Sequence, residues 1–276
     1  MMRSLWTAAS GMRAQQVNVD TIANNVANIN TIGYKSQQAS FKSLLYQNLQ
    51  STSTNNAGEN KPVAAEVGLG SRVAAITSTF TQGNLTHVEN PFSVALEGDG
   101  FFQIRTESGE LQYTRDGSFE ISPVANGNML CTSDGNPVLD AYGNAIVLPS
   151  NRVATDLVVN QDGTLAFPDG SGNPAVLTDA NGRPVKFGIY QFNNPAGLAK
   201  EGSNNYSVTV ASGAAVAENG NAAVKQTKTH QYYTEASNVD VANEMVNLIV
   251  AQRAYEMNSK AIQASDEMMQ QANALR

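Results

Sequence analysis

The sequence is poor in the side chains on which disulfides, metal sites and nucleophilic catalysis depend. Cys131 is the only cysteine among 276 residues, so it cannot form an internal disulfide, and we expect it to pack as a small apolar side chain. His87 and His230 are the only histidines, and neither has cysteine partners at metal-ligand spacing. A zinc site or a histidine-based triad would need such supporting groups. We therefore expect no catalytic residues, no metal and no cofactor, and we predict that the chain is not an enzyme.

Complete phosphate-binding and calcium-binding loops are also missing from the sequence. Residues 98–100 and 68–70 read Gly-Asp-Gly and Gly-Leu-Gly, but neither completes G-x-G-x-x-G and no G-K-[ST] follows. The Asp-Gly pairs at 162 and 169 do not belong to a calcium-loop pattern. We therefore expect these segments to form turns rather than ligand sites.

Charged side chains are scarce and unevenly distributed. They make up 15% of the chain, with a net charge of −7, whereas roughly 25% is typical of soluble domains. The negative total argues against nucleic acid as a partner. Residues 1–60 carry a net charge of +2 and residues 234–276 a net charge of −3. The two ends therefore attract each other, though weakly where they are exposed.

Long apolar runs are absent as well. No run approaches the roughly 18 residues of a membrane span, so we expect no membrane-spanning segment. The first residues, Met1 to Trp6, imitate a signal peptide, but Gly11, Arg13 and Gln15 interrupt the apolar region that such a peptide needs. If the protein leaves the cytoplasm, we expect it to be exported without a cleaved signal peptide.

What the N-terminal end does contain is a heptad pattern. Residues 4–30 place apolar side chains at alternating steps of three and four, which predicts a long amphipathic helix with a narrow contact face. The positions expected to carry helix contacts are Leu5, Met12, Val19, Ile22, Val26 and Ile29.

The C-terminal end repeats this pattern. Residues 234–276 contain no glycine or proline, which predicts a helix of about 35 residues, roughly 50 Å long. Ser237 or Asn238 is the expected N-terminal cap. The expected contact positions are Val241, Met245, Leu248, Tyr255, Ile262 and Met269.

Each apolar stripe could face an ordinary intramolecular core or an assembly of several chains. Burying the stripe of the first helix supplies roughly 10–20 kcal/mol gross. Ordering about 27 residues costs roughly 1–2 kcal/mol each for the backbone alone, and intrahelical hydrogen bonds add little net. A single partner barely stabilises such a helix, so the pattern favours contacts with several neighbours.

Between the two ends, short β-type runs replace the heptads. Residues 50–61 have no apolar periodicity and are expected to form a loop or linker. Asp-Gly and Asn-Gly pairs then separate short runs up to about residue 230, which is typical of an all-β domain. The expected strands are 72–80, 93–96, 101–106, 156–159 and 186–192. The predicted fold class is α+β, with the N- and C-terminal helices paired as a coiled-coil-like domain and an all-β domain inserted between them.

One motif is specific enough to indicate a family. Residues 24–35 read Asn-Asn-Val-Ala-Asn-Ile-Asn-Thr-Ile-Gly-Tyr-Lys, in which asparagines interrupt the helix and glycine lets the chain turn. This stretch resembles the basal-body rod motif of bacterial flagellar axial proteins, the family of rod and hook subunits. Its motif positions are Asn24, Asn25, Ala27, Asn28 and Gly33.

Three other parts of the chain are similar to the same family. The start, residues 2–12, resembles distal rod subunits more than hook subunits. Residues 98–102 and 113–119 are similar to the core of the family's β-domain. Residues 235–241 and 252–260 resemble its C-terminal signature. The resemblance covers both ends and the start of the middle, and it is less distinctive over residues 120–230.

The resemblance implies a structural subunit of the flagellar distal rod, which polymerises helically into a hollow drive shaft and transmits motor torque to the hook. Residues 1–33 and 234–276 would form a helical inner tube, residues 34–70 a connecting rod-specific segment, and residues 71–233 a β-rich outer domain. The implied partners are further copies of the chain, neighbouring rod and hook subunits, outer-envelope ring proteins and the flagellar export apparatus. The implied location is the periplasm-spanning rod of the basal body.

Two other functions stay open at this point. The chain could be another flagellar axial subunit, from the proximal rod or the hook, or a secreted β-rich adhesin with helical ends. An adhesin would be a stable monomer with ordered ends, whereas an assembling subunit would order its ends only among its neighbours.

Overall fold

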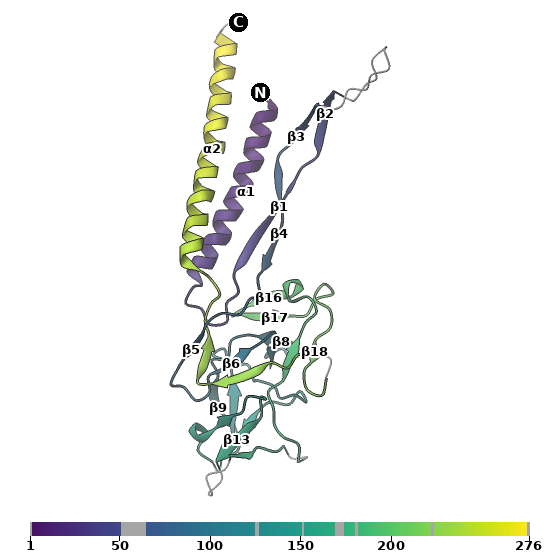
Figure 1. Cartoon of the computed structure of the whole chain (residues 1–276), viewed down its shortest axis with the longest axis vertical. Helices are drawn as coiled ribbons and strands as arrows, with labels where there is room; N and C mark the ends of the chain where they lie inside the picture. The colour runs from purple at the N-terminus through teal and green to yellow at the C-terminus, as the bar shows by residue number, and fades with distance from the viewer. Residues whose placement is uncertain are drawn as a thin grey trace. The chain divides into compact units, whose positions relative to one another are not determined.

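The computed structural model describes residues 2–50, 65–124, 127–150, 152–168, 174–179, 182–221 and 224–274. Over these residues the chain is α+β, as predicted, with one long helix near each end and short strands between them (Figure 1). The chain divides into two compact units. Unit 1 comprises Met1–Ala27, Gln37–Ser78 and Asp240–Arg276, and unit 2 comprises Asn28–Ser36 and Thr79–Val239.

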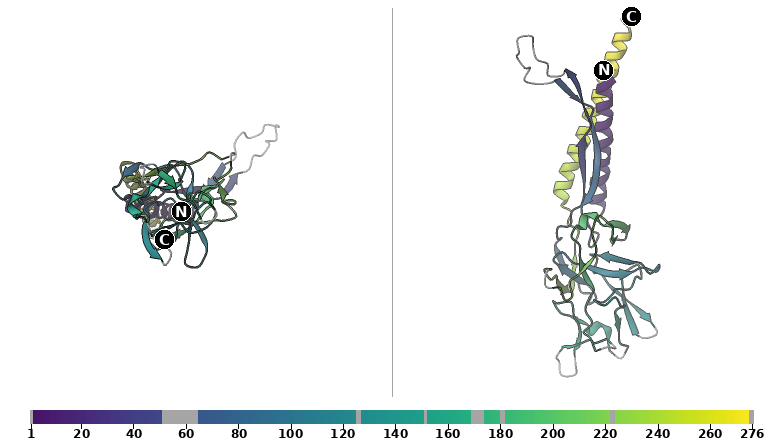
Figure 2. Two further views of the ribbon diagram at one scale, coloured as in Figure 1. Left: turned by 90° about the horizontal axis from the view of Figure 1, so that it is seen from below. Right: turned by 90° about the vertical axis from the view of Figure 1, so that its right-hand side faces the viewer.

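The described residues of unit 1 form two helices and four strands. Its elements are α1 (Met2–Ala27), β1 (Gln37–Ser43), β2 (Tyr46–Gln50), β3 (Ala65–Gly68), β4 (Ser71–Ser78) and α2 (Val241–Ala274). Figures 1 and 2 show α1 and α2 running alongside each other, with both chain termini at the same end of the pair. β1 pairs with β4 and β2 with β3, both antiparallel, and the β1–β4 ladder lies along α1. Of the expected linker 50–61, residue 50 ends β2 and residues 51–61 lie outside the described part of the chain.

The predicted end of the first helix was wrong by three residues. α1 ends at Ala27 rather than at residue 30, so Ile29 lies in the turn that follows. The Thr31 hydroxyl donates to the Asn28 side-chain oxygen at 3.1 Å, and Gly33 has a φ of 70°. A side chain that bonds its own turn competes with the helix, and glycine takes the left-handed conformation at little cost.

The predicted cap of the second helix was also wrong. The Asp240 Oδ1 atom accepts hydrogen bonds from the backbone N–H groups of Ala242 at 2.9 Å and Asn243 at 3.4 Å. A carboxylate at this position satisfies free N–H groups and lies at the positive end of the helix dipole. Ser237 and Asn238 precede the cap, so α2 starts later than the sequence suggested.

The contact between the helices follows a heptad line on α2. Ser265 and Ser4 share a hydrogen bond of 3.4 Å, and Gly11 approaches Asn258 so closely that an added Cβ would lie 2.9 Å from its amide nitrogen. Ala251 on the same line is buried. The contacting positions are thus 251, 258 and 265, seven apart, with opposite ends of the two helices paired. The helices therefore run antiparallel within one chain.

Within the described part of unit 2, the strands form five antiparallel groups. The six-stranded sheet has the order β16-β17-β8-β7-β15-β18, two three-stranded sheets have the orders β11-β10-β9 and β12-β13-β14, and the two-stranded ladders are β19-β6 and β20-β5. The strands, with two short 3-10 helices η1 and η2, are β5 (Leu85–His87), β6 (Val94–Glu97), β7 (Phe101–Arg105), β8 (Leu111–Thr114), β9 (Glu120–Val124), β10 (Gly127–Cys131), β11 (Val147–Leu148), η1 (Ala154–Asp156), β12 (Val158–Val159), β13 (Leu165–Pro168), β14 (Pro174–Val176), β15 (Ile189–Gln191), η2 (Pro195–Gly197), β16 (Ala199–Gly202), β17 (Asn205–Ser207), β18 (Val216–Ala217), β19 (Lys228–Gln231) and β20 (Tyr233–Glu235).

Aromatic side chains form the centre of unit 2. Phe102 packs edge-on against Phe119, with ring centroids 5.0 Å apart, and against Phe187 at 5.4 Å. Edge-to-face pairs of this kind add stability beyond their buried area. Cys131 is buried beside this core, as expected of a small apolar residue. Unit 2 therefore has an apolar core of its own.

The expected strands differ from the observed ones mainly at their ends. The runs 72–80, 93–96 and 101–106 correspond to β4, β6 and β7, each shifted by no more than two residues. The run 156–159 is a strand only at its last two residues, because Asp156 closes η1. The run 186–192 forms a strand only over β15. Turn residues at both ends shorten these strands relative to their apolar runs.

Candidate functional site: an uncovered apolar surface and a buried junction

The heptad residues of α1 lie where a helix partner can reach them. Ile22 is buried, and Leu5, Met12, Val19 and Val26 are half-buried. On α2 the half-buried members of the predicted set are Leu248, Ile262 and Met269, whereas Val241, Met245 and Tyr255 are exposed. Part of the predicted set is thus covered within the chain, whereas Val241, Met245 and Tyr255 remain exposed.

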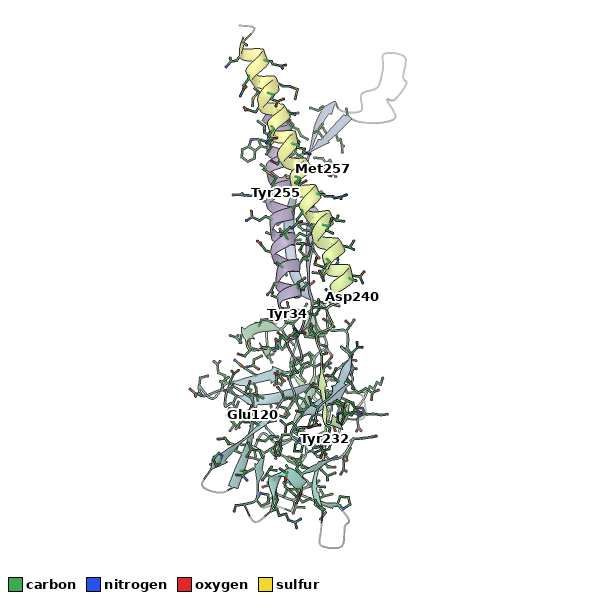
Figure 3. The ribbon with its side chains drawn as sticks, turned by 90° about the vertical axis from the view of Figure 1, so that its left-hand side faces the viewer. Tyr34, Glu120, Tyr232, Asp240, Tyr255 and Met257 are labelled. Carbon is green, nitrogen blue, oxygen red and sulfur yellow. The ribbon has the colours of Figure 1, made fainter. Side chains whose placement is uncertain are left out.

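Unit 1 leaves most of its large apolar side chains uncovered. Among its described residues, the buried hydrophobic ones are Ala8, Ala14, Ile22 and Ala251, so Ile22 is the only large one. The exposed large ones are Trp6, Phe41, Leu45, Tyr46, Leu49, Val67, Leu69, Ile76, Val241, Met245, Val246, Ile249, Val250, Tyr255, Met257 and Met268. Figure 3 labels two of them, Tyr255 and Met257, on α2. Exposure of so many large apolar side chains in one unit indicates an interaction site.

A groove crosses this surface between α1 and the strands. It has a volume of about 720 Å³. The α1 wall consists of Trp6, Ala9, Ser10, Arg13, Ala14 and Val17, and the other wall includes Leu44, Leu69 and Val73. Trp6 is 75% exposed, although a tryptophan side chain gains more from burial than almost any other. We call this feature the α1 groove.

Gly70 allows the strands to approach α1 at the groove. The Ser10 hydroxyl accepts a hydrogen bond from the Ser71 backbone N–H at 3.3 Å. A Cβ atom at Gly70 would overlap the Ser10 hydroxyl, and Gly70 has a φ of 117°, which other residues rarely adopt. Glycine at position 70 thus fixes one wall of the α1 groove.

A cluster of opposite charges is buried in unit 2. The Lys35 Nζ atom lies 2.6 Å from Glu235 Oε1, and an Nη atom of Arg115 lies 3.3 Å from Glu235 Oε2. The three side chains are at most 1% exposed. We call them the junction triad, because Lys35 follows α1 in the sequence and Glu235 shortly precedes α2. Buried ions of this kind are stable only when each is paired and hydrogen-bonded.

Backbone groups add further hydrogen bonds to the junction triad. Lys35 donates to the Thr81 carbonyl at 2.8 Å, and Arg115 donates to the Gly98 carbonyl at 2.6 Å. The Gly83 backbone N–H donates to the Glu235 carboxylate at 2.8 Å. Burial lowers the pKa of the Lys35 ammonium below its ordinary value, while the nearby Glu235 carboxylate opposes that shift. The triad therefore joins three separate passes of the chain.

Hydrogen bonds to the main chain also join the segments around the triad. The Gly33 N–H donates to the Glu235 carbonyl at 2.8 Å. The Asn238 side-chain oxygen accepts from the Ser36 N–H at 2.7 Å, and its amide donates to the Thr79 carbonyl at 2.8 Å. These hydrogen bonds thus hold the segment after α1 and the segment before α2 together within unit 2.

The family-motif residues occupy defined places in this arrangement. Within unit 1, Asn25 is buried, where its amide donates to the Gln37 carbonyl and its oxygen accepts from the Gln37 N–H, both at 2.8 Å. Its amide also donates to the Glu244 carboxylate at 3.1 Å. Asn28 and Gly33 form the turn after α1. Asn24 and Ala27 lie exposed on the last turn of α1.

The sequence did not predict the roles of the junction-triad residues or of the asparagine beside them. Lys35, Arg115, Glu235 and Asn238 all lie in segments that resemble the flagellar family. A charged side chain inside an otherwise apolar or amide-rich motif was the available signal, because such a charge is retained in a core only when it has a partner. The ion-pair partners of Glu235 lie 200 and 120 residues away in the sequence, at Lys35 and Arg115, and periodicity does not report contacts over such distances.

Ligand-binding features are few in the part of the chain that the structure describes. No group of three or more histidine, cysteine, aspartate or glutamate side chains lies close enough together to hold a metal ion in these residues. Neither described helix is long and apolar enough to cross a membrane. The free thiol of Cys131 is buried, and burial raises its pKa.

Comparison with protein families gives three matches that lie in order along the chain. Residues 5–35 match the family described as "Flagella basal body rod protein". Residues 95–167 match "Flagellar hook protein FlgE/F/G D1 domain". Residues 230–275 match "Flagellar basal body rod FlgEFG protein C-terminal". The first and last matches include Lys35 and Glu235, the two ends of the junction triad.

Curated relatives are similar to the chain over its whole length. It is 42% identical to the flagellar basal-body rod protein FlgG of Borreliella burgdorferi, over 100% of this chain and 99% of that protein. It is 38% identical to FlgG of Caulobacter vibrioides over 100% of both, and 35% identical to FlgG of Bacillus subtilis over 98% of both. With these full-length similarities, the chain belongs to the flagellar basal-body rod protein family.

Proposed function

We propose that the chain is a structural subunit of the flagellar distal rod and has no enzymatic activity. It polymerises with copies of itself into a hollow helical shaft that transmits motor torque to the hook. The relatives named FlgG and the matches to rod families support this proposal. The observation that carries it is the apolar surface of unit 1, where Ile22 is the only large apolar side chain that is buried among the described residues.

The energetics of unit 1 favour assembly over an isolated monomer. Each large apolar side chain contributes about 1.5–3 kcal/mol when it is fully buried, and most of those in unit 1 remain exposed. The same helices still lose conformational entropy when they become ordered. Neighbouring copies supply the missing burial, so α1 and α2 pair as a coiled-coil-like inner layer that becomes stable within the polymer.

The domain arrangement follows from this proposal. Residues 1–33 and 234–276 form the inner tube, with contacts through Leu5, Met12 and Val19 and through the α2 positions described above. Residues 71–233 supply most of an inserted β-rich outer domain, and residues 34–70 supply a connecting segment specific to rods. The further partners are neighbouring rod and hook subunits, outer-envelope ring proteins and the export apparatus, which the chain passes without a cleaved signal peptide.

Electron microscopy of the purified full chain at high concentration tests this proposal. We expect straight tubes, because a rod subunit packs into a rigid shaft. Limited proteolysis of dilute protein should cut first in α1 and α2 and leave unit 2 intact, since unit 2 has its own core. A stable monomer with protease-resistant helices and no polymer at any concentration would refute the proposal and favour an adhesin.

The second candidate is a proximal rod or hook subunit. Residues 95–167 match a D1 family whose description includes hook proteins, and this match supports the second candidate. Expression of the chain in a strain that lacks only its distal rod subunit decides between the two. Restored motility supports the distal rod, and failure to restore it, with normal expression and export, supports another axial position.

A further inference from the structure

The outer face of α2 carries a second heptad stripe that no described residue of unit 1 covers. It consists of Met257, Ala261, Ala264 and Met268, which are all exposed, and Met257 is 66% exposed. These positions lie at offsets of 0, 4, 7 and 11, the spacing of a coiled-coil contact face. They project from a side of α2 different from that of Ala251, Asn258 and Ser265, which face α1. We call this set the outer α2 stripe.

The α1 groove has the same periodicity as the outer α2 stripe. Its helical wall consists of Trp6, Ala9, Ser10, Arg13, Ala14 and Val17, and within it Trp6, Ser10, Arg13 and Val17 lie at the same offsets of 0, 4, 7 and 11. A helix with an apolar stripe at this spacing fits such a groove by inserting its side chains between those of the wall. Because the groove and the stripe are different surfaces, contacts between them continue from one copy to the next instead of closing a dimer.

We propose that the outer α2 stripe of one copy docks into the α1 groove of a second copy, with the two helices antiparallel. This inference rests on the proposed polymeric function and assigns two of its contact surfaces. α1 and α2 run antiparallel within each chain. When neighbouring copies point in the same direction along a shaft, α2 of one copy is therefore antiparallel to α1 of the next. The occupant of the groove is therefore another copy of this chain.

Side-chain size supports one register for this contact. In the antiparallel alignment Met268 meets Trp6, Ala264 meets Ser10, Ala261 meets Arg13 and Met257 meets Val17. The small residues of the stripe thus leave room for the Arg13 side chain, and the methionines adapt to the apolar ends of the groove.

The same alignment brings together two oppositely charged side chains that form no ion pair within the described part of one chain. Arg253 lies four residues before Met257, and Asp20 lies three residues after Val17, so the register brings Arg253 of one copy beside Asp20 of the next. Both side chains are exposed, and neither takes part in an ion pair within the described part of the chain. A parallel alignment would put these charges at opposite ends of the groove. The charge pattern therefore favours the antiparallel contact.

Charge reversal tests the contact in the full-length protein. Asp20→Arg and Arg253→Asp each place like charges together, so each single variant should raise the critical concentration for polymerisation roughly tenfold. The double variant restores an opposite pair and should polymerise within about threefold of wild type. Glu120→Arg is the matched control, since it makes an equal charge change on an exposed residue of β9 in unit 2 (Figure 3).

Mixing the two single variants distinguishes contacts between copies from contacts within one chain. The arginine introduced at position 20 of one variant can meet the aspartate introduced at position 253 of the other. The unchanged Asp20 and Arg253 of the two variants can also pair, so the mixture should polymerise at a lower total concentration than either variant alone. The critical concentration is read by sedimentation, and circular dichroism of the dilute proteins checks that unit 2 is folded in every variant.

Each outcome decides one of two questions. If wild type forms tubes but the single reversals have no effect, or if neither the double variant nor the mixture recovers, the proposed contact is wrong and another surface fills the groove. If wild type forms no polymer at all, the proposed rod function fails, whatever the variants do. Recovery in the double variant without recovery in the mixture assigns the charge pair to a single chain and also overturns the contact.

Discussion

Replacing Glu235 by glutamine tests how much the junction triad stabilises unit 2. Glu235→Gln keeps the size of the side chain but removes the negative charge that Lys35 and Arg115 share at 2.6 and 3.3 Å. Both cations then remain buried without a counter-charge. Breaking a buried ion pair in this way costs about 3–5 kcal/mol, and we expect a loss of that size in the free energy of unfolding of unit 2.

Urea denaturation of the full chain measures this loss. Near-ultraviolet circular dichroism from the tyrosines of unit 2 is the suitable signal, because the only tryptophan, Trp6, lies in unit 1. Asp162→Asn is the matched control, since it removes a carboxylate whose ion pair with Lys186, at 3.4 Å, is partly exposed. Such surface pairs contribute less than about 1 kcal/mol, so the control should change stability little.

A second substitution separates loss of charge from loss of shape. Lys35→Met in the Glu235→Gln background removes one of the two unpaired cations and leaves an apolar side chain of similar length. The double variant should therefore recover part of the stability lost by Glu235→Gln alone. A loss below about 1 kcal/mol for Glu235→Gln, or a double variant that is less stable than the single one, would refute the assigned role of the triad.

Three further changes test other parts of the structure. Asn25→Ala removes the hydrogen bonds that the Asn25 side chain makes to the backbone N–H and carbonyl of Gln37, and it should raise the critical concentration for polymerisation at least about tenfold, whereas Asn247→Ala on the exposed face of α2 should not. Gly33→Ala should cost unit 2 more than the roughly 1–2 kcal/mol expected for a left-handed residue, because an added Cβ would lie 2.9 Å from the Asp116 nitrogen; equal losses in Gly33→Ala and Gly109→Ala, which has open space around it, would contradict this. Burial raises the pKa of Tyr206 to about 12 from 10.0, so the folded form keeps the proton that the unfolded chain loses, and this group should lower the stability of unit 2 by about 1.4 kcal/mol per pH unit between pH 10 and about 12. The difference between the alkaline absorbance titrations of wild type and Tyr206→Phe should have its midpoint near pH 12, and a midpoint near 10 would show that the side chain is not buried.

The long helices were predictable because their determinants are local. The absence of glycine and proline from residues 234–276 and the heptad spacing on both ends are properties of neighbouring residues. The ends of the helices were less predictable. Asp240 rather than Asn238 caps α2, because Asn238 bonds to Ser36 and Thr79 instead. A cap can be chosen only when competing partners are known, and these partners are distant in the sequence.

The choice of contact face on α2 shows the same limit. The heptad pattern alone allows more than one line of positions, and the sequence favoured the line through Val241, Leu248 and Tyr255. The structure adds the line through Ala251, Asn258 and Ser265, where small or polar side chains permit close approach to α1. Apolar periodicity identifies the largest side chains, whereas a tight helix contact can depend on small ones.

The sequence by itself determined the fold class, the two terminal helices and the family, because composition, periodicity and short motifs express local preferences of the chain. Only the tertiary structure decided which distant residues pair and which apolar side chains stay exposed. It joined Lys35 and Glu235, 200 residues apart, in a buried charge cluster, and it left the outer α2 stripe and the α1 groove uncovered. Long-range pairing and exposure depend on how distant segments meet, and the free energy of those contacts is not a property of any segment alone.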